Sequence, residues 1–156
     1  RKVTDKVCPT TEYGRQKAET EKLLLDMGAT VVRFSKVLGW DVPLFEGWIS
    51  RLERNEFIYP YSNMSMSPIP VGFAVRVLSN VRGGLFQVSG DKDLSYSRIA
   101  YYIANLIGKD LALVQPVKTN SHPWTTLECN ITGIDVPDPW EVIQRWCNDR
   151  LLTRTQ

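Results

Sequence analysis

Hydrophobic patterns typical of helices and of buried strands alternate along the chain, and this alternation restricts the fold more than any other feature. Apolar residues recur at helical spacing in residues 43–55 and 94–108. Two short apolar runs, TVVRF at 30–34 and GGLFQVSG at 83–90, have the length and composition of buried strands. Strands that are separated by helices usually pair in parallel, so the pattern predicts an α/β protein.

Three more helices and two more strands complete the prediction. The helices cover residues 9–28, 71–81 and 138–152, and the strands cover 57–61 and 111–117. Leu23 and Met27 contribute to an apolar face on the first of these helices. The last helix begins with an acid at the cap, Asp138, and a proline at the first helical position, Pro139. Residues 117–139 are rich in proline and threonine, and we expect them to be mostly irregular.

Size and charge exclude several classes of function. The chain has 156 residues and a net charge of +2, with acidic and basic residues interspersed. This balance argues against a nucleic-acid-binding surface, which needs a strongly basic face. No apolar run is long enough to cross a membrane, and the first residues lack the apolar centre of a secretory signal. We therefore expect a cytoplasmic protein that binds neither nucleic acid nor a membrane.

The cysteines and the single histidine do not predict a metal site. Cys8, Cys129 and Cys147 are widely spaced and form no CxxC pair, and His122 is the only histidine. Structural zinc sites need four such ligands in close groups. We expect three reduced thiols, in agreement with a cytoplasmic location.

Tyr13 and Lys17 are the strongest candidates for catalytic residues. Residues four apart lie on one face of a helix, and a lysine ammonium beside a tyrosine phenol favours the phenolate. A tyrosine phenol normally has a pKa near 10, and lowering such a pKa to about 7 takes roughly 4 kcal/mol. A tyrosine in that state can exchange a proton with a carbonyl or carbinol oxygen. The lysine has three donors that can also hold ribose hydroxyls.

The spacing alone is a weak signal. A Tyr-x-x-x-Lys pair arises by chance in about one chain in three of this length and composition. The alternative is that Tyr13 and Lys17 lie on an ordinary solvated helix face. The residues around the pair are needed to decide between these two interpretations.

The surrounding sequence resembles the extended short-chain dehydrogenase/reductases. In YGRQKAETEKLLLDMGATVVRFSKVLG (13–39), a Tyr-Gly-x-x-Lys helix precedes a strand and an Arg-x-x-x-Val-Leu-Gly turn, as in that family. Downstream, the chain is most similar to the sugar-nucleotide reductase and epimerase branch. The matching features are Ser-Pro-Ile at 67–69 before a helix, the strand in GGLFQVSG, and HPWTTLECNITGI at 122–134.

The resemblance implies a fold and a set of roles. The fold is the C-terminal part of a Rossmann-type NAD(P)-binding domain plus a small α/β substrate cap. Tyr13 is then the catalytic proton donor and acceptor, and Lys17 is its partner, which also binds the cofactor ribose. Phe34 and Ser35 are expected to join Tyr13 and Lys17 in binding NAD or NADP, near the nicotinamide. The implied substrate is a nucleotide-linked sugar or a similar carbonyl compound.

Two further residues are expected to bind the substrate. His122 occupies the position where the family commonly has an arginine that helps to bind phosphate, and Trp124 lies beside it in the same loop. The chain departs from the family again at Gly72, where an aspartate commonly begins the helix. These departures concern the substrate side and leave the Tyr13/Lys17 pair intact.

The family holds its dinucleotide on a Gly-x-x-Gly-x-x-Gly turn, and this chain has no such sequence. We therefore expect the chain to be the C-terminal half of an enzyme, with the N-terminal dinucleotide-binding half absent. Residues 1–39 would form the catalytic helix and the strand after it, and 40–156 the last sheet strand, the cap helices and the C-terminal helix. The exposed sheet edge should then bind the N-terminal half or a second copy of the chain.

Two other functions remain open at this stage. A reductase-like protein without catalytic activity could use the same fold to regulate or bind a partner. A small autonomous binding domain without redox chemistry would instead need a complete sheet within the 156 residues. The first interpretation, an incomplete reductase or epimerase that is inactive by itself, agrees with most of the motifs.

Overall fold

The computed structural model describes residues 1–120 and 126–152. The helices are α1 (Glu12–Asp26), α2 (Pro43–Glu53), α3 (Val71–Asn80), α4 (Tyr96–Leu106) and α5 (Pro139–Leu152), with one 3₁₀ turn, η1 (Leu111–Leu113). The strands are β1 (Thr30–Phe34), β2 (Val37–Leu38), β3 (Ser65–Met66), β4 (Ile69–Pro70), β5 (Gly84–Val88) and β6 (Leu94–Ser95). No helix in the described part is long and apolar enough to cross a membrane.

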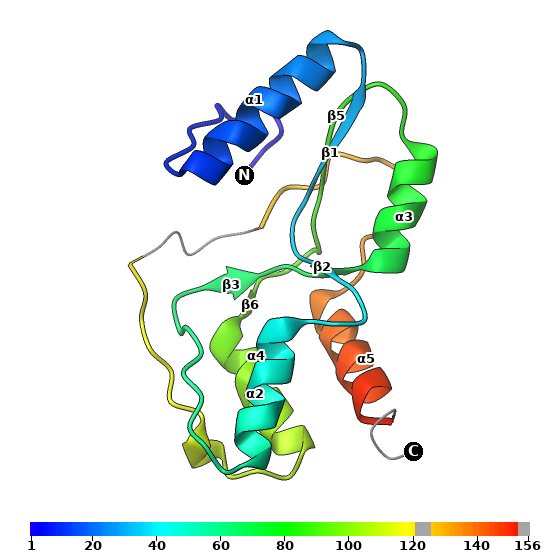
Figure 1. Cartoon of the computed structure of the whole chain (residues 1–156). Coiled ribbons are helices and arrows are strands. Elements are labelled where there is room, and N and C mark those ends of the chain that lie inside the picture. The colour runs from blue at the N-terminus through cyan, green and yellow to red at the C-terminus, as the bar shows by residue number, and fades with distance from the viewer. Residues whose placement is uncertain (121–125, 153–156) are drawn as a thin grey trace.

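The strands form three short pairs. β1 and β5 are parallel, in register from Thr30 opposite Gly84 to Phe34 opposite Val88. β2 and β4 are also parallel, whereas β3 and β6 are antiparallel. The β1–β5 pair forms the upper part of the molecule with α1 and α3 on its two sides, and α2, α4 and α5 form the lower part (Figure 1). The α/β class with parallel pairing, predicted from the sequence, is therefore confirmed.

Each part of the molecule has its own hydrophobic core. In the upper part, Phe73 and Val77 of α3 pack with Val88 of β5 and with half-buried residues of the β1–β5 pair. The lower core is larger and joins α2, α4 and α5. Its buried members include Phe45 and Trp146, whose rings meet edge to face at 5.1 Å. This packing explains why the helical patterns of these segments were readable from the sequence.

The helices begin and end close to the predicted positions. The last helix starts as its sequence indicates, because Asp138 Oδ1 accepts a 2.7 Å hydrogen bond from the Trp140 backbone. The first helix is also present, but none of its residues is buried, and its apolar residues Leu23 and Met27 are exposed. A sequence pattern shows which face of a helix is apolar, but it does not show what covers that face.

The strand predicted over residues 111–117 is wrong. Asp110 Oδ1 accepts a hydrogen bond from Ala112 N, and this local contact caps a 3₁₀ turn at 111–113. Only two isolated parallel bridges follow, Val114 with Ile58 and Val117 with Tyr61. The predicted strand at 57–61 is thus reduced to the same two bridges. Short polar caps compete with strand formation, and apolar composition alone does not reveal the outcome.

The two outer edges of the β1–β5 pair differ. On the outer side of β5, Asn130 N donates to Gln87 O, and the Asn130 side-chain oxygen accepts from Gln87 N at 2.6 Å. In the described part of the chain, no strand pairs with the other edge of β1. A complete parallel sheet, which would support an autonomous binding domain, is therefore not formed by the described residues.

Candidate functional site

The helix α1 positions the predicted catalytic pair. Thr11 caps the helix, because its Oγ1 accepts a 3.1 Å hydrogen bond from Gly14 N. Glu12 adds a negative charge at the positive end of the helix dipole. At the other end the chain turns at Gly28, whose φ of +75° favours glycine. Tyr13 therefore lies in the first helical turn and Lys17 one turn later.

The structure brings Tyr13 and Lys17 together on an open face. The Lys17 ammonium lies 5.4 Å from the centroid of the Tyr13 ring, and Tyr13 is 70% exposed. At that distance the ammonium interacts favourably with the ring face. Among the described residues, neither the Tyr13 hydroxyl nor the Lys17 ammonium is engaged in a hydrogen bond or a salt bridge. Both groups are consequently available to a ligand that approaches α1.

A polar network, which sequence reasoning missed, attaches α1 to the strands. The Arg33 guanidinium of β1 donates to both carboxylate oxygens of Glu21, at 2.7 and 2.6 Å. It also donates to the Gln87 side-chain oxygen of β5 at 3.0 Å. Donation to Glu21 raises the pKa of the Arg33 guanidinium, although partial burial opposes the shift. The signal was an arginine inside an otherwise apolar strand pattern.

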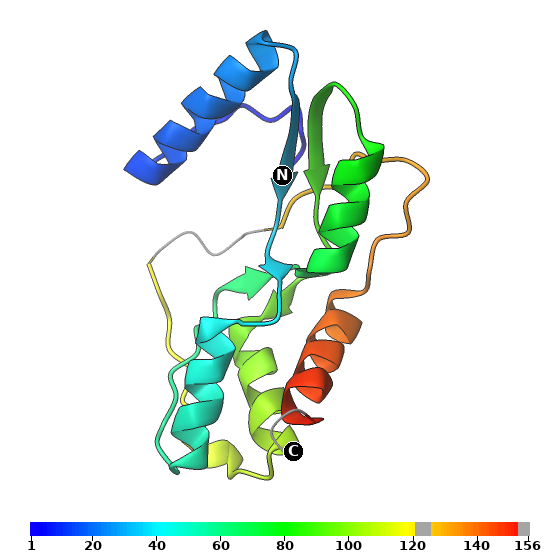
Figure 2. The same cartoon turned by 45° about the vertical axis from the view of Figure 1, so that its right-hand side comes forward.

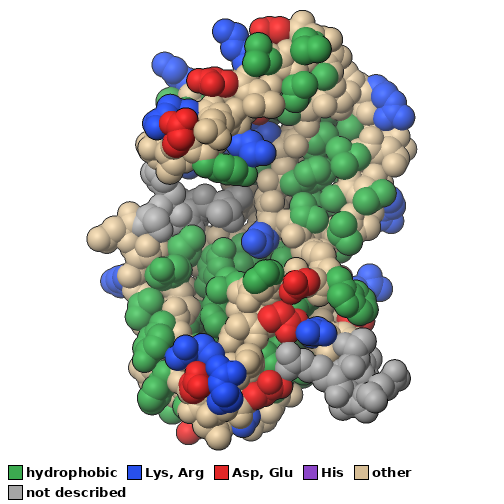
Figure 3. Space-filling model, viewed as in Figure 1, with side chains coloured by type: hydrophobic (Ala, Val, Ile, Leu, Met, Phe, Trp, Pro, Cys, Tyr) green, Lys and Arg blue, Asp and Glu red, His purple; other side chains and the backbone are tan. Residues whose placement is uncertain are grey.

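This network adds a polar attachment to the half-buried stripe of α1 that includes Ala18 and Leu25. No residue of α1 is buried, and the helix projects beside the β1–β5 pair (Figure 2). Hydrophobic side chains are visible on the surface of α1 in the space-filling view (Figure 3). Val32 and Phe34 face α3, whereas Arg33 and Gln87 turn to the opposite side, toward α1. The ion pair between Arg33 and Glu21 thus sets the position of the catalytic candidates.

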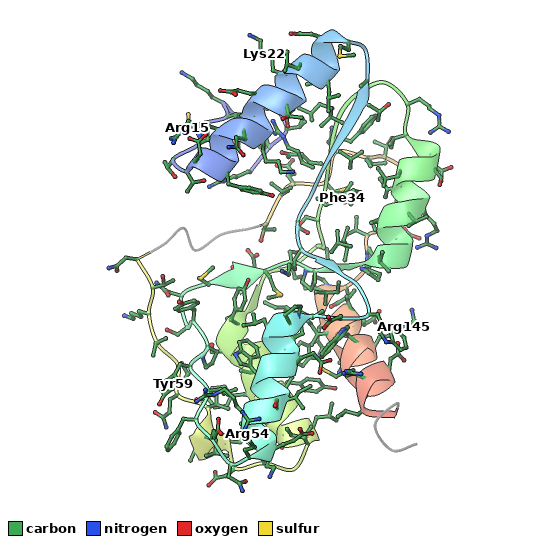
Figure 4. The ribbon with its side chains drawn as sticks, viewed as in Figure 1. Arg15, Lys22, Phe34, Arg54, Tyr59 and Arg145 are labelled. Atoms are coloured by element: carbon green, nitrogen blue, oxygen red, sulfur yellow. The ribbon has the colours of Figure 1, made fainter. Side chains whose placement is uncertain are left out.

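Phe34 and Ser35 lie at the carboxyl end of β1. Phe34 is half-buried against the α3 core, and Figure 4 labels it near the centre of the molecule. Ser35 Oγ donates to the Ser67 carbonyl oxygen at 2.5 Å, and Ser35 N donates to Val88 O at 2.9 Å. The carboxyl ends of parallel strands are where open α/β sheets usually bind ligands. Contact of Phe34 and Ser35 with a nicotinamide stays a prediction.

Two buried hydroxyls gather at the same end of the sheet. Ser67 and Ser89 are fully buried, and their Oγ atoms have no hydrogen-bond partner among the described residues. Gly90 N donates to Ser67 O, and a side chain at Gly90 would collide with Ser67 and Pro139. The strand ends and the start of α5 are therefore closely packed, which fixes the backbone on which a ligand site is built.

The predicted substrate-binding residues, His122 and Trp124, lie outside the described residues. The cysteines are free thiols, of which Cys8 is exposed, Cys129 half-buried and Cys147 buried. In the part of the chain that the structure describes, no group of three or more histidine, cysteine, aspartate or glutamate residues could hold a metal ion.

Comparisons with protein-family models and with curated proteins find no match. Solved structures do match. dTDP-4-dehydrorhamnose reductase from Bacillus anthracis str. Ames, in complex with NADP, aligns with a TM-score of 0.80 and 17% identity, over 95% of this chain and 59% of its own. The corresponding reductase from Clostridium acetobutylicum gives a TM-score of 0.80 and 19% identity, over 97% and 60%.

A third solved structure also matches this chain. The Bordetella bronchiseptica enzyme WbmG, in complex with NAD and UDP, gives a TM-score of 0.75 and 17% identity, over 95% of this chain and 54% of that one. The fold is thus that of the Rossmann-type sugar-nucleotide reductases and epimerases, and the predicted resemblance is confirmed at the level of fold. The chain spans about 60% of the length of the two reductases.

Proposed function

We propose that this chain is the catalytic-helix and substrate-cap part of an NAD(P)-dependent reductase or epimerase. The parent enzyme acts on a nucleotide-linked sugar or a similar carbonyl compound. Residues 1–39 provide the catalytic helix and the following strand, and residues 40–156 provide the last sheet strand, the cap and the C-terminal helix. The 156-residue chain alone is inactive, because it carries no glycine-rich turn for the dinucleotide phosphates.

The Tyr13/Lys17 pair carries this proposal. Tyr13 is 70% exposed and lies beside the Lys17 ammonium on the same face of α1, so both groups are accessible to a cofactor and a substrate. The pair lies on a helix of this chain, and proteins of similar fold have been crystallised with NADP or NAD. Both the exposed chemistry and the fold therefore support the same activity.

The residues present fit a nicotinamide nucleotide at its ribose end. Lys17 has three N–H donors for ribose hydroxyls, and its ammonium lies 5.4 Å from the centroid of the Tyr13 ring. The bound nicotinamide supplies or accepts the hydride. Tyr13 transfers a proton to the carbonyl oxygen during reduction and takes it back during oxidation. Phe34 and Ser35 stand at the carboxyl end of β1, where the Phe34 ring packs toward α3, so any contact of these two residues with the nicotinamide involves Ser35 or the backbone of Phe34.

The open edge of β1 gives the missing half a place to bind. In the described residues this edge has no strand partner, and an incomplete parallel sheet is unfavourable in water. An N-terminal dinucleotide-binding half, encoded in the same gene or supplied as a separate chain, would continue the sheet from β1 and bring its phosphate-binding turn toward Lys17.

The test uses the complete gene product and follows NAD(P)H oxidation with nucleotide-sugar ketones as substrates. Tyr13→Phe should lower kcat by about 100-fold or more, because proton transfer typically contributes that much. NAD(P)H affinity should change little, since the ring and Lys17 remain. The control is Tyr59→Phe, at an exposed tyrosine on the segment that leads to β3 (Figure 4), and its turnover should stay unchanged.

Turnover that survives Tyr13→Phe would contradict the assignment of the proton donor. Absence of any turnover in the complete protein, together with tight binding of another protein, would favour the regulatory alternative instead. Lys17→Met separates the two roles of the lysine, because it should weaken NAD(P)H binding as well as lower kcat.

A further inference from the structure

A pocket between the upper and lower parts of the molecule contains none of the residues assigned to the proposed reaction. Its volume is about 580 Å³, and it lies between the loop after β2, the start of α3 and one face of α5. Pockets of this size commonly hold small molecules. No residue of α1 lines it, so it is separate from the Tyr13/Lys17 pair.

The walls of the pocket offer apolar surface for a ligand. Leu38 and Val142 are buried at its floor, and Pro70 and Val71 form the side that belongs to α3. Trp40 also lines the pocket but is 70% exposed, so a large part of its indole remains uncovered. An indole in this situation is well suited to stack on a flat apolar group.

Four charged side chains of both signs line the same pocket. Arg76 comes from α3, and Glu141, Arg145 and Asp149 come from α5 (Figure 4 labels Arg145). The α5 residues follow one another at intervals of four, so they share one helix face. None of the four forms a salt bridge with a described residue; Arg76 only stacks over Phe73, at 5.6 Å. Two cations and two anions, all of them exposed, therefore line one cavity.

Two further residues with polar groups, Arg150 and Trp146, line the pocket. Arg150 lines the pocket too, but its guanidinium is already paired with both oxygens of Glu46, and this pairing raises the Arg150 pKa. Trp146 is only 7% exposed, and its indole N–H lacks an acceptor among the described residues. A buried N–H without an acceptor is unfavourable, so a ligand oxygen or an ordered water is expected there.

We propose that this pocket binds a small zwitterion with a flat apolar side chain, namely a free aromatic α-amino acid. Its carboxylate accepts hydrogen bonds from Arg76 and Arg145. Its ammonium donates to Glu141 or Asp149, and its ring stacks on Trp40 over Leu38 and Val142. A zwitterion matches both signs of charge that line the pocket, whereas a simple anion or a simple cation matches only one. Binding does not depend on the proposed reductase chemistry.

The test is a titration of the uniformly ¹⁵N-labelled protein, observed through the indole N–H resonances of its five tryptophans. The probes are L-phenylalanine, 3-phenylpropionate, which lacks the ammonium, and 2-phenylethylamine, which lacks the carboxylate. The Trp146 resonance, assigned with Trp146→Phe, should shift and saturate with L-phenylalanine. Each of the two partial analogues should bind about tenfold more weakly or worse.

Variants locate the site. Arg145→Gln and Asp149→Asn should each weaken L-phenylalanine binding by about tenfold, because each removes one charged hydrogen bond. Arg54→Gln is the matched control. Arg54 is an exposed arginine at the C-terminal end of α2, and it does not line the pocket. A Trp146 resonance that does not move with L-phenylalanine would overturn the proposal. So would equal affinity for 3-phenylpropionate, or an equal loss in Arg54→Gln.

Discussion

Cys147 shows how burial changes the chemistry of a single residue. Its thiol lies in the lower core, and desolvation raises the pKa from the ordinary value of 9.0 to about 12. The thiol therefore stays protonated in the folded chain at pH values where it would ionise in the unfolded chain. Above pH 9 the unfolded state binds fewer protons than the folded state, so stability must fall as the pH rises toward 12.

We predict that raising the pH from 8 to 10 lowers the free energy of unfolding by about 1 kcal/mol through this thiol alone. Urea unfolding at the two pH values measures the effect, and Cys147→Ala provides the reference without the thiol. The difference between the two pH values should be smaller in Cys147→Ala. An identical pH dependence in both proteins would show that the thiol is accessible to water.

Gly90 is a residue whose side-chain hydrogen cannot be replaced without a clash. A methyl group there would approach Pro139 Cγ to 2.4 Å and Ser67 Oγ to 2.8 Å. Gly90→Ala should cost about 1–3 kcal/mol, because the strand end and the start of α5 must move apart. Gly47→Ala is the control, since it adds a methyl group in open space on the helix α2. It should stabilise the protein by about 0.5–1 kcal/mol.

Thermal unfolding of both variants compares them directly. A Gly90→Ala protein as stable as the original would mean that the close approach between Gly90 and Pro139 is absent in solution. The sequence marked Gly90 as the end of a strand, but the contact with Pro139 joins residues 49 positions apart and could not be predicted from local pattern. Tyr13 and Lys17, only four residues apart, could be placed together because helix geometry alone decides their distance.

At the scale of elements, one partly buried ion pair connects α1 to β1. Arg33 and Glu21 have side-chain exposures of 21% and 17%, intermediate between a surface pair and a buried pair. Glu21→Gln should therefore weaken the attachment of α1 by about 1–2 kcal/mol, because it leaves the Arg33 charge without its counterion. Hydrogen exchange of the α1 amides measures this loss. Exchange in α3, on the other face of the sheet, should change less.

The control for this prediction is Glu12→Gln on the same helix. Glu12 pairs with Arg15, but both side chains are well exposed, and such pairs contribute at most about 0.5 kcal/mol. If both variants accelerate exchange equally, the Arg33–Glu21 pair has no special role in holding α1.

Helices that fill the core were the elements most readily predicted. The apolar residues of α2 and α4 repeat at helical spacing, and the lower core buries those faces, so pattern and environment agree. The segment 111–117 failed because a single side-chain cap at Asp110 decided between strand and 3₁₀ turn. The network of Glu21, Arg33 and Gln87 was missed for another reason: its partners come from three elements whose contacts no local pattern records.

At the scale of the whole molecule, the decisive feature is the asymmetry of the β1–β5 pair. The outer edge of β5 is occupied by the segment around Asn130, whereas the outer edge of β1 is open in the described residues. The absence of a glycine-rich turn predicts an incomplete sheet, and among the described residues the edge of β1 away from β5 has no strand partner. Open edges with unpaired backbone groups tend to bind another strand.

We predict that the 156-residue chain self-associates when no N-terminal half is present. Ser35 N donates to Val88 O, and strand N–H groups alternate in direction, so the N–H of Val32 faces the open edge. Val32→Pro removes this edge donor without removing a hydrogen bond to β5. Val32→Ala is the matched control, because it shortens the same side chain but keeps the N–H.

Sedimentation velocity over a range of micromolar concentrations, with circular dichroism to verify folding, separates the possibilities. The original chain and Val32→Ala should form dimers or larger species, and Val32→Pro should shift toward monomer. A well-folded monomeric original chain would contradict the prediction, and so would equal association of the two variants. If an added N-terminal half dissolves the self-associated species into a one-to-one complex, the same edge serves both contacts, because a strand edge can accept only one partner at a time.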